Sequence, residues 1–169
     1  ISTGDTPELT QTADLLAATG KAIGARITVK VFSGGDLNTT VIRPREYEAL
    51  LFGEVVGRSA DVYAFWHSSQ RNDPGLNLSL YTNAKADTLV SDARRETDSE
   101  AREQTLAAFD EVIRKEYPAV FLYVPEFVYV TPETLQGISL GSLTNTAERF
   151  LNVHEWYKGT ERVWDIFLP

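Results

Sequence analysis

A change of hydrophobic period within the first 31 residues constrains the fold more than any other feature. Thr6 is suited to cap a helix whose first residue is Pro7, and apolar side chains then recur at helical spacing as far as Gly24. Apolar and polar residues alternate after that, with the period of two that a half-buried strand requires. The sequence therefore predicts a helix over residues 7–23, a strand over residues 25–31, and an α/β fold with a mixed sheet flanked by helices.

The rest of the chain continues this alternation of helices and strands. Thr97, with Glu100 three residues later, fits a capping box, which predicts a helix over residues 99–116. Pro118 ends that helix, and the long apolar run after it suits a buried strand. The remaining predicted elements are short helical turns near residues 37–42, a helix over 86–96, strands over 47–52, 61–66 and 119–124, and a loop over 68–83. We expect the strands over 25–31, 47–52 and 119–124 to share one sheet.

Composition limits the class of protein. With 169 residues, 43% of them hydrophobic, the chain can bury one core, and we expect a single domain over residues 1–169. Lysine and arginine number 16 against 24 aspartate and glutamate, and the resulting net charge of -8 repels phosphate backbones, so nucleic acid is excluded as a partner. No apolar run approaches the roughly 18 residues that a membrane-spanning helix needs.

One short pattern points to hydrolytic chemistry. Residues 137–141 fit G-x-S-x-G, in which a strained strand-to-helix turn exposes a serine, here Ser139, to a histidine base. A helix should begin just after that serine, but residues 142–145 have the composition of a turn. A surface turn explains the pattern more simply, and a serine hydrolase using Ser139 is kept as the alternative function.

A metal centre has little support in the sequence. Cysteine is absent, and His67 and His154 are the two histidines, so neither a thiolate site nor a three-histidine site can form. His154 opens the zinc pattern H-E-x-x-H, but Lys158 stands where the second histidine is needed. We therefore expect no metal and no cofactor.

Residues 61–70 form the most unusual segment of the chain, because an acidic residue and several aromatic residues precede a polar loop. Aromatic walls with a few polar groups suit a cleft for a small ligand or a peptide. An amphipathic strand with core aromatics and a turn aspartate would explain the same pattern, and the pattern does not decide between the two. The candidate ligand-binding residues are Asp61, Tyr63, Phe65, Trp66, His67, Ser68, Gln70 and Asn77.

The same residues carry a resemblance to a known family. Several runs of residues follow one another in the order seen in that family, over nearly the whole chain. They are residues 45–53, 61–70, 74–77, 81–83, 87–89, 102–116, 118–123, 129–130, 149–153 and 155–157. In these runs the chain resembles the family 5 extracellular solute-binding proteins, the oligopeptide- and dipeptide-binding components of ABC importers.

The resemblance implies a fold and a function. It implies that the chain is the C-terminal lobe of a type II periplasmic-binding-protein-like fold, without the first lobe, and that peptide is captured in the cleft between lobes. Asp61 would hold the peptide's α-ammonium, although Val62, Tyr63 and Ala64 stand where a proline commonly follows this aspartate. Family members also bind nickel, heme or sugars.

The resemblance also implies partners and a location. The partners would be a peptide and the membrane permease subunits of an ABC importer, and the isolated lobe would be monomeric and without catalytic activity. The location would be extracytoplasmic, in the periplasm or at the outer face of the cell membrane. The full-length protein could carry a lipid anchor.

Overall fold

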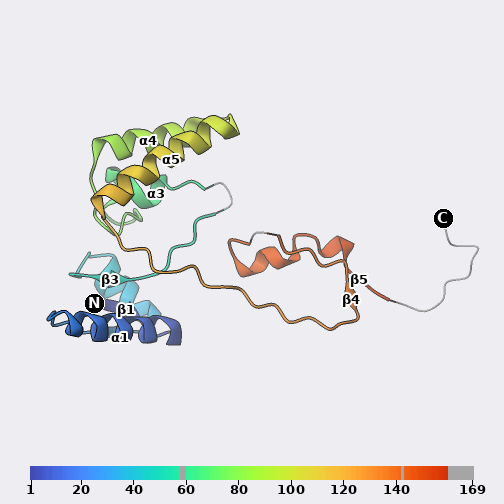
Figure 1. Ribbon diagram of the computed structural model, residues 1–169, viewed down its shortest axis with the longest axis horizontal. Helices are drawn as coiled ribbons and strands as arrows, with labels where there is room; N and C mark the ends of the chain where they lie inside the picture. Colours follow the sequence, from blue (N-terminus) through green and yellow to red (C-terminus); the bar gives the residue numbers. More distant parts are fainter. Residues whose placement is uncertain (58–59, 142, 160–169) are drawn as a thin grey trace, which may run out of the picture. The chain divides into compact units, whose positions relative to one another are not determined.

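The computed structural model describes residues 1–57, 60–141 and 143–159 (Figure 1). The chain divides into two compact units, Ile1–Val120 and Phe121–Pro169, which are considered separately below. The expectation of a single domain over residues 1–169 stays a prediction. None of the helices within the described ranges has both the length and the apolar character that crossing a bilayer requires.

The first unit begins with a three-stranded parallel sheet. Strand β1 (Ser2–Gly4) lies between β2 (Lys30–Phe32) and β3 (Leu50–Leu51). Thr3 is fully buried at its centre, and its hydroxyl donates a 3.0 Å hydrogen bond to the Leu51 carbonyl. This side-chain bond adds to the backbone ladder and fixes the register of β3 against the central strand.

Helix α1 (Pro7–Ala22) confirms the helix predicted from the period of the apolar residues. Pro7 occupies the first turn, as expected. Thr6 precedes it in an extended conformation, but its side chain makes no capping hydrogen bond. Gly24 follows the helix with a φ of 85°, a conformation that side chains rarely adopt. Gly20 is buried near the end of this helix. Ile27 packs against it, and a Cβ at position 20 would lie 2.4 Å from the Ile27 Cδ1 atom.

The strands are shorter than the alternation of residues predicts. β2 begins only at Lys30 and β3 has two residues, so most of the predicted segments 25–31 and 47–52 are not strand. The prediction of a buried strand over residues 119–124 is wrong, because Val120 is 79% exposed and Val124 is 90% exposed. A strand needs a neighbour for its backbone hydrogen bonds, and this run pairs with no strand in the described residues.

Between β2 and β3 the chain forms two short helical segments. They are α2 (Gly34–Asp36) and the π-helix η1 (Leu37–Ile42), which confirms the short helix predicted near residues 37–42. Leu37 and Val41 are buried on η1. These two side chains hold the segment beside β1, and the chain leaves it toward β3.

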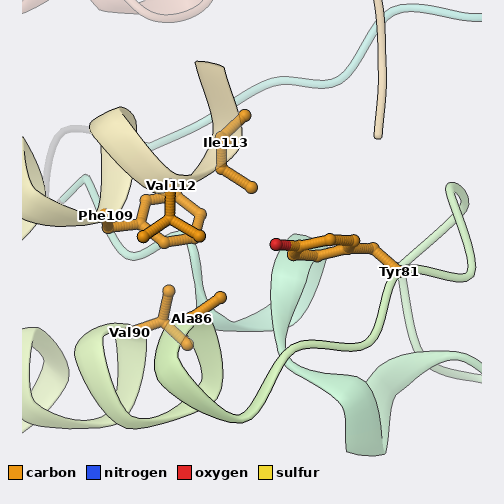
Figure 2. Close-up of a cluster of buried hydrophobic side chains, with 6 residues drawn as sticks. All are labelled: Tyr81, Ala86, Val90, Phe109, Val112 and Ile113. Atoms are coloured by element: carbon orange, nitrogen blue, oxygen red, sulfur yellow. The ribbon is translucent and has the colours of Figure 1, made fainter. Parts of the chain in front are cut away.

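Two helices carry the largest buried cluster of the first unit. Helix α4 (Ala84–Arg95) packs along α5 (Ser99–Glu116), as Figure 1 shows. Figure 2 shows the side chains buried between them and the preceding loop, which are Tyr81, Ala86, Val90, Phe109, Val112 and Ile113. We call this set the α4–α5 core, and both helices confirm the sequence prediction.

The cap of α5 lies one residue later than predicted. Asp98, not Thr97, accepts the hydrogen bond from a first-turn amide, with 2.8 Å between its Oδ1 and the Ala101 nitrogen. The carboxylate of Glu96 accepts bonds from the backbone nitrogens of Thr97 and Asp98. The predicted Thr97 cap is therefore wrong, because a neighbouring aspartate takes the capping position.

The second unit has little regular structure. Strands β4 (Leu135–Gln136) and β5 (Tyr157–Lys158) pair antiparallel, and the 3-10 helices η3 (Thr146–Phe150) and η4 (Val153–Glu155) lie between them in sequence. The guanidinium of Arg149 lies over the rings of Phe127, Tyr129 and Phe150. Short strands and cation–π contacts of this kind have no periodic sequence pattern.

A hydrogen-bonded carboxylate joins the end of α5 to the loop before α4. Glu116 accepts bonds from the Tyr81 hydroxyl at 2.6 Å and from the Asn83 side-chain amide at 2.7 Å. The bond from Tyr81, and then that from Asn83, lower the pKa of Glu116. Burial, followed by the bond to Glu116, raises the pKa of Tyr81.

We predict that Glu116→Gln lowers the Tm at pH 7 but not at acid pH. The pKa of Glu116 is lowered in the folded state, so its stabilisation is present above the unfolded value of about 4.5 and is lost as pH falls through the folded value. Thermal melts at pH 7, 5 and 3 should show a difference from wild type that shrinks with acidity. Glu111→Gln, which removes an exposed carboxylate from the same helix, is the control. A difference that is the same at all three pH values would contradict the assignment.

Candidate functional site

Most of the predicted ligand-binding residues lie on one short helical stretch. It consists of α3 (Tyr63–Trp66) and the 3-10 helix η2 (Ser68–Gln70), so the strand predicted over residues 61–66 is wrong. The physical reason is Asp61, whose Oδ1 atom accepts a 3.1 Å hydrogen bond from the Tyr63 nitrogen. A carboxylate that takes up an otherwise unpaired first-turn amide favours a helix start over an extended chain.

Asp61 also binds Arg94 on α4. The Arg94 Nε atom lies 3.1 Å from Asp61 Oδ2, and the two side chains are 52% and 31% exposed. The same guanidinium lies over the Tyr63 ring, 4.6 Å from its centroid. Both oxygens of Asp61 thus have partners within the chain, and α3 is joined to α4 by an ion pair and a cation–π contact.

One edge of this stretch is polar and aromatic, and we call it the α3–η2 edge. It is formed by Tyr63, His67, Ser69 and Gln70. The rings of Tyr63 and His67 are stacked, with centroids 4.2 Å apart and planes inclined by 21°. His67 Nδ1 accepts the Ser69 backbone N–H at 3.1 Å and lies 2.8 Å from the Ser69 hydroxyl. Because Nδ1 is an acceptor here, the neutral ring carries its proton on Nε2.

Ser69 was missed among the candidate residues although it is the centre of this edge. Its exposed hydroxyl also accepts a 3.1 Å hydrogen bond from the Gln70 side-chain amide and lies 3.4 Å from the Tyr63 hydroxyl. The sequence signal that could have identified Ser69 is its position between Ser68 and Gln70, which were both predicted to bind the ligand. The edge offers a ligand a hydroxyl, a phenol, an amide and an imidazole between Tyr63 and Gln70.

The three predicted aromatic residues, Tyr63, Phe65 and Trp66, are all half-buried, and Tyr63 and Trp66 pack against the α4–α5 core. The ring of Trp66 meets Tyr81 and Phe109 edge-on, with centroids 6.3 and 6.1 Å apart. Phe65 is half-buried on the same turn. For Trp66 the structure therefore favours the alternative that the sequence left open, an aromatic residue that belongs to the core.

Ser68 is bound to α4. Its backbone nitrogen and its hydroxyl donate to the two oxygens of Asp87, at 2.8 and 2.6 Å. Beside this contact is an open, mainly polar hollow of about 270 Å³. It is lined by His67, Asp87, Thr88, Ser91, Asp92 and Arg95. Its lining suits water or a polar group better than an apolar side chain.

Asn77 holds the loop together from inside. It is 0% exposed, and its side-chain nitrogen lies within hydrogen-bond distance of the carbonyls of Trp66, His67 and Tyr81 at 3.2, 3.2 and 3.0 Å. Its side-chain oxygen accepts from the Tyr81 nitrogen and the Ser79 hydroxyl, both at 3.1 Å. A side chain so placed has no surface for a ligand, so we assign Asn77 a structural role.

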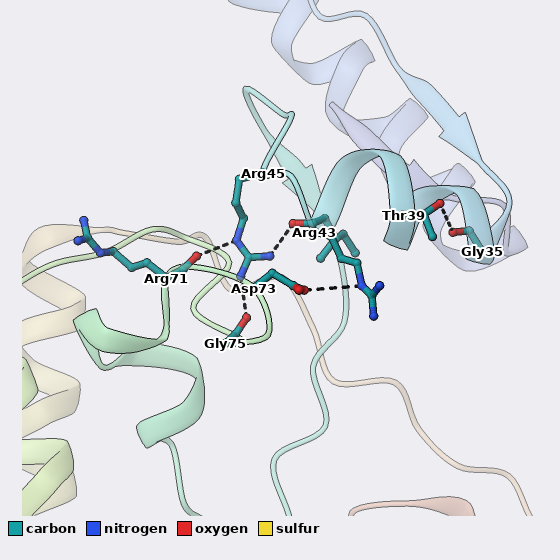
Figure 3. A network of polar contacts seen from close by, with 8 residues as sticks. Gly35, Thr39, Arg43, Arg45, Arg71, Asp73 and Gly75 are labelled. Atoms are coloured by element: carbon teal, nitrogen blue, oxygen red, sulfur yellow. Dashed lines mark hydrogen bonds and ion pairs between the residues drawn. The ribbon is translucent and has the colours of Figure 1, made fainter.

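Arg45 holds the loop from the other side, as Figure 3 shows. Its guanidinium donates to the carbonyls of Arg71 at 2.9 Å and Gly75 at 2.6 Å, and to that of Ile42 on η1. Gly75 cannot carry a side chain, because a Cβ would lie 2.2 Å from the Gln70 carbonyl oxygen. The periodicity of the sequence does not indicate these contacts, because the carbonyls of Arg71 and Gly75 lie far from Arg45 along the chain.

The hydrolase alternative has no support in the structure. Ser139 is exposed on a segment without regular structure, and none of the described residues after it begins an α-helix, as a nucleophile elbow requires. Gly137 is explained by packing, because a Cβ there would lie 2.2 Å from the Glu155 carbonyl oxygen.

The expectation that no metal or cofactor is needed stays a prediction. In residues 1–57, 60–141 and 143–159, no three or more His, Cys, Asp or Glu side chains come together as metal ligands would. His154 lies 3.8 Å from the carboxylate of Glu155 in an exposed pair.

Comparison with known proteins places the chain in context. No family model matches it. It is 27% identical over 138 residues to the oligopeptide-binding protein AppA of Bacillus subtilis, and this match covers 81% of the chain and 24% of AppA. The resemblance to the family 5 solute-binding proteins is confirmed.

The fold is shared with solved structures of family 5 relatives. AppA of Bacillus subtilis in complex with a nonapeptide superimposes with a TM-score of 0.71 at 24% identity, covering 94% of this chain and 31% of AppA. NikZ of Campylobacter jejuni in complex with Ni(L-His) gives 0.66 at 22% identity, covering 93% of this chain and 32% of NikZ. The periplasmic binding protein DppA of Helicobacter pylori, in complex with the peptide STSA, gives 0.61 at 20%, covering 94% and 30%.

These matches confirm the α/β fold class predicted from the sequence. The chain spans only about a quarter to a third of the length of the relatives it matches. The arrangement of residues 61–83 is therefore one part of a larger binding-protein fold in those relatives.

We predict that Asn77→Ala destabilises the first unit by about 2–3 kcal/mol, because it removes the side-chain partners of the buried Tyr81 backbone nitrogen and carbonyl. Urea unfolding followed by circular dichroism measures the difference. Asn72→Ala, an exposed asparagine of the same loop, is the control and should change stability by less than about 0.5 kcal/mol. A loss for Asn77→Ala no larger than that of the control would show that the amide does not hold the loop.

Proposed function

We propose that the chain is the ligand-binding lobe of an extracytoplasmic solute-binding protein, which captures peptides in a cleft closed by a first lobe. The observation that carries the proposal is the α3–η2 edge, a group of polar and aromatic side chains in which Ser69 is exposed and Tyr63, His67 and Gln70 are half-buried. The loop behind this edge is held by hydrogen bonds from the buried Asn77 and from Arg45. A preformed edge of this kind suits binding, because little order must be created when the ligand arrives.

The class of ligand follows from the relatives. AppA is described as an oligopeptide-binding protein and was solved with a nonapeptide, and DppA was solved with a tetrapeptide. NikZ was solved with nickel and histidine, so the shared fold alone does not select peptides. The AppA match, which is found in the sequence as well as in the fold, favours a peptide.

The same reasoning gives the partners and the location. The full-length protein would deliver its peptide to the membrane permease subunits of an ABC importer, at the outer face of the membrane or in the periplasm. We assign the chain no catalytic role and expect the isolated lobe to be monomeric. A lipid anchor on the full-length protein would keep the binding protein near its permease.

Within this proposal Asp61 is the acceptor for the α-ammonium of the peptide. It lies just before α3, where its carboxylate accepts the Tyr63 backbone N–H, and its side chain is partly exposed. In a closed cleft a charge-assisted hydrogen bond of this kind contributes about 1.5–3 kcal/mol. An isolated lobe cannot exclude water from the contact, so most of that contribution should be absent from the 169-residue chain.

We predict that Asp61→Asn weakens peptide binding by the two-lobe protein by about 10- to 100-fold, because the shape is kept and the counter-ion is lost. Isothermal calorimetry with wild type, the variant and the 169-residue chain measures the affinities, and the isolated chain should bind weakly or not at all. Asp110→Asn, which removes an acidic residue paired with Arg114 on α5, is the control. Unchanged affinity in Asp61→Asn would remove Asp61 from the site.

A further inference from the structure

Arg94 already occupies the position on Asp61 that a ligand cation would need. Its Nε atom lies 3.1 Å from Oδ2, while Oδ1 accepts the Tyr63 backbone N–H. An ammonium approaching Asp61 would therefore meet a carboxylate whose two oxygens have internal partners and whose charge is balanced by a guanidinium. Two cations a few ångströms apart repel each other, so they cannot both gain fully from one carboxylate.

Arg94 has a second contact that would hold it after displacement. Its guanidinium lies over the Tyr63 ring at 4.6 Å from the centroid, an arrangement that stabilises a cation without using Asp61. The side chain is also half-exposed, so its hydration is retained. The exchange of one cation for another at Asp61 therefore needs a small shift of the guanidinium and no rearrangement of α4.

We infer that Arg94 competes with the ligand's ammonium for Asp61 and so sets how strongly the site prefers peptides with a free amino terminus. The inference rests on the proposed function. A peptide with a free ammonium must displace the ion pair, whereas an N-acetylated peptide has no cation to place there and leaves the pair intact. Arg94 is thus a specificity-determining residue that keeps binding at Asp61 weak enough for release.

The competing explanation is a purely structural tether between α3 and α4. A tether would act on every ligand alike, because losing it would loosen the whole edge. A competitor acts only on ligands that carry the ammonium. The ratio of affinities for a free and an acetylated peptide separates the two explanations, since a general loss of order cancels in the ratio.

The test uses the two-lobe protein and the tetrapeptide Ser-Thr-Ser-Ala, the peptide found with DppA, together with its N-acetylated form. Calorimetry gives the affinity ratio of free to acetylated peptide for wild type, Arg94→Gln and Arg94→Met, the last of which keeps aliphatic cover over Tyr63. The control is Lys85→Gln, which removes an exposed cation from the same helix α4, outside the hollow. Thermal melts establish that each variant is folded.

We expect both Arg94 variants to raise the ratio by about two- to fivefold, the range for removing a partly exposed ion pair. Lys85→Gln should leave the ratio unchanged. A ratio that stays constant or falls in both folded Arg94 variants would overturn the inference and leave the proposed function standing. If wild type binds neither peptide, the proposed function fails and the inference fails with it.

Discussion

The buried side chain of Asn77 is the constraint on which the candidate site depends. One amide contacts the carbonyls of Trp66 and His67, where α3 ends, and also both backbone groups of Tyr81, where the chain turns into α4. Without it the buried backbone nitrogen and carbonyl of Tyr81 would lose these partners, at a cost comparable to a large share of the stability of a small domain. The α3–η2 edge keeps its shape because the loop behind it has one arrangement that satisfies these groups.

The other contacts of the loop strengthen this arrangement from different directions. Arg45 binds two of its carbonyls from the side of η1, and Ser68 binds Asp87 from the side of α4. Tyr81 ties its end to Glu116 on α5. A segment of irregular backbone thereby acquires the rigidity of the helices around it, which is how loops can present binding groups in fixed positions.

The sequence predicted the helices better than the strands or the site. The helices near 7–23 and 99–116 follow from long apolar periods, which tertiary contacts rarely override. The apolar run at 119–124 has the composition of a buried strand, but Val120 and Val124 are exposed. A strand forms only beside a neighbouring strand, and local composition does not indicate whether such a neighbour exists. The π-helix η1 was indicated only as a short helix.

For the site, composition identified the right segment but not the roles of its residues. Asp61 was chosen for its charge, yet its helix-starting bond and its pairing with Arg94, 33 positions later, depend on packing of α3 against α4. Asn77 lies in one of the runs that carry the resemblance and was predicted to contact the ligand, but its side chain is fully buried. Contacts between residues far apart in the sequence leave no local pattern from which these roles could be predicted.

The central claim is that a peptide's amino terminus meets Asp61 on the α3–η2 edge. A crystal structure of the two-lobe protein with Ser-Thr-Ser-Ala tests it most directly. The account predicts the ammonium nitrogen about 3 Å from the Asp61 carboxylate, with the Arg94 guanidinium moved off Oδ2 and still lying over Tyr63. A peptide whose ammonium is held by other residues, with Asp61 and Arg94 still paired at 3.1 Å, would contradict the account.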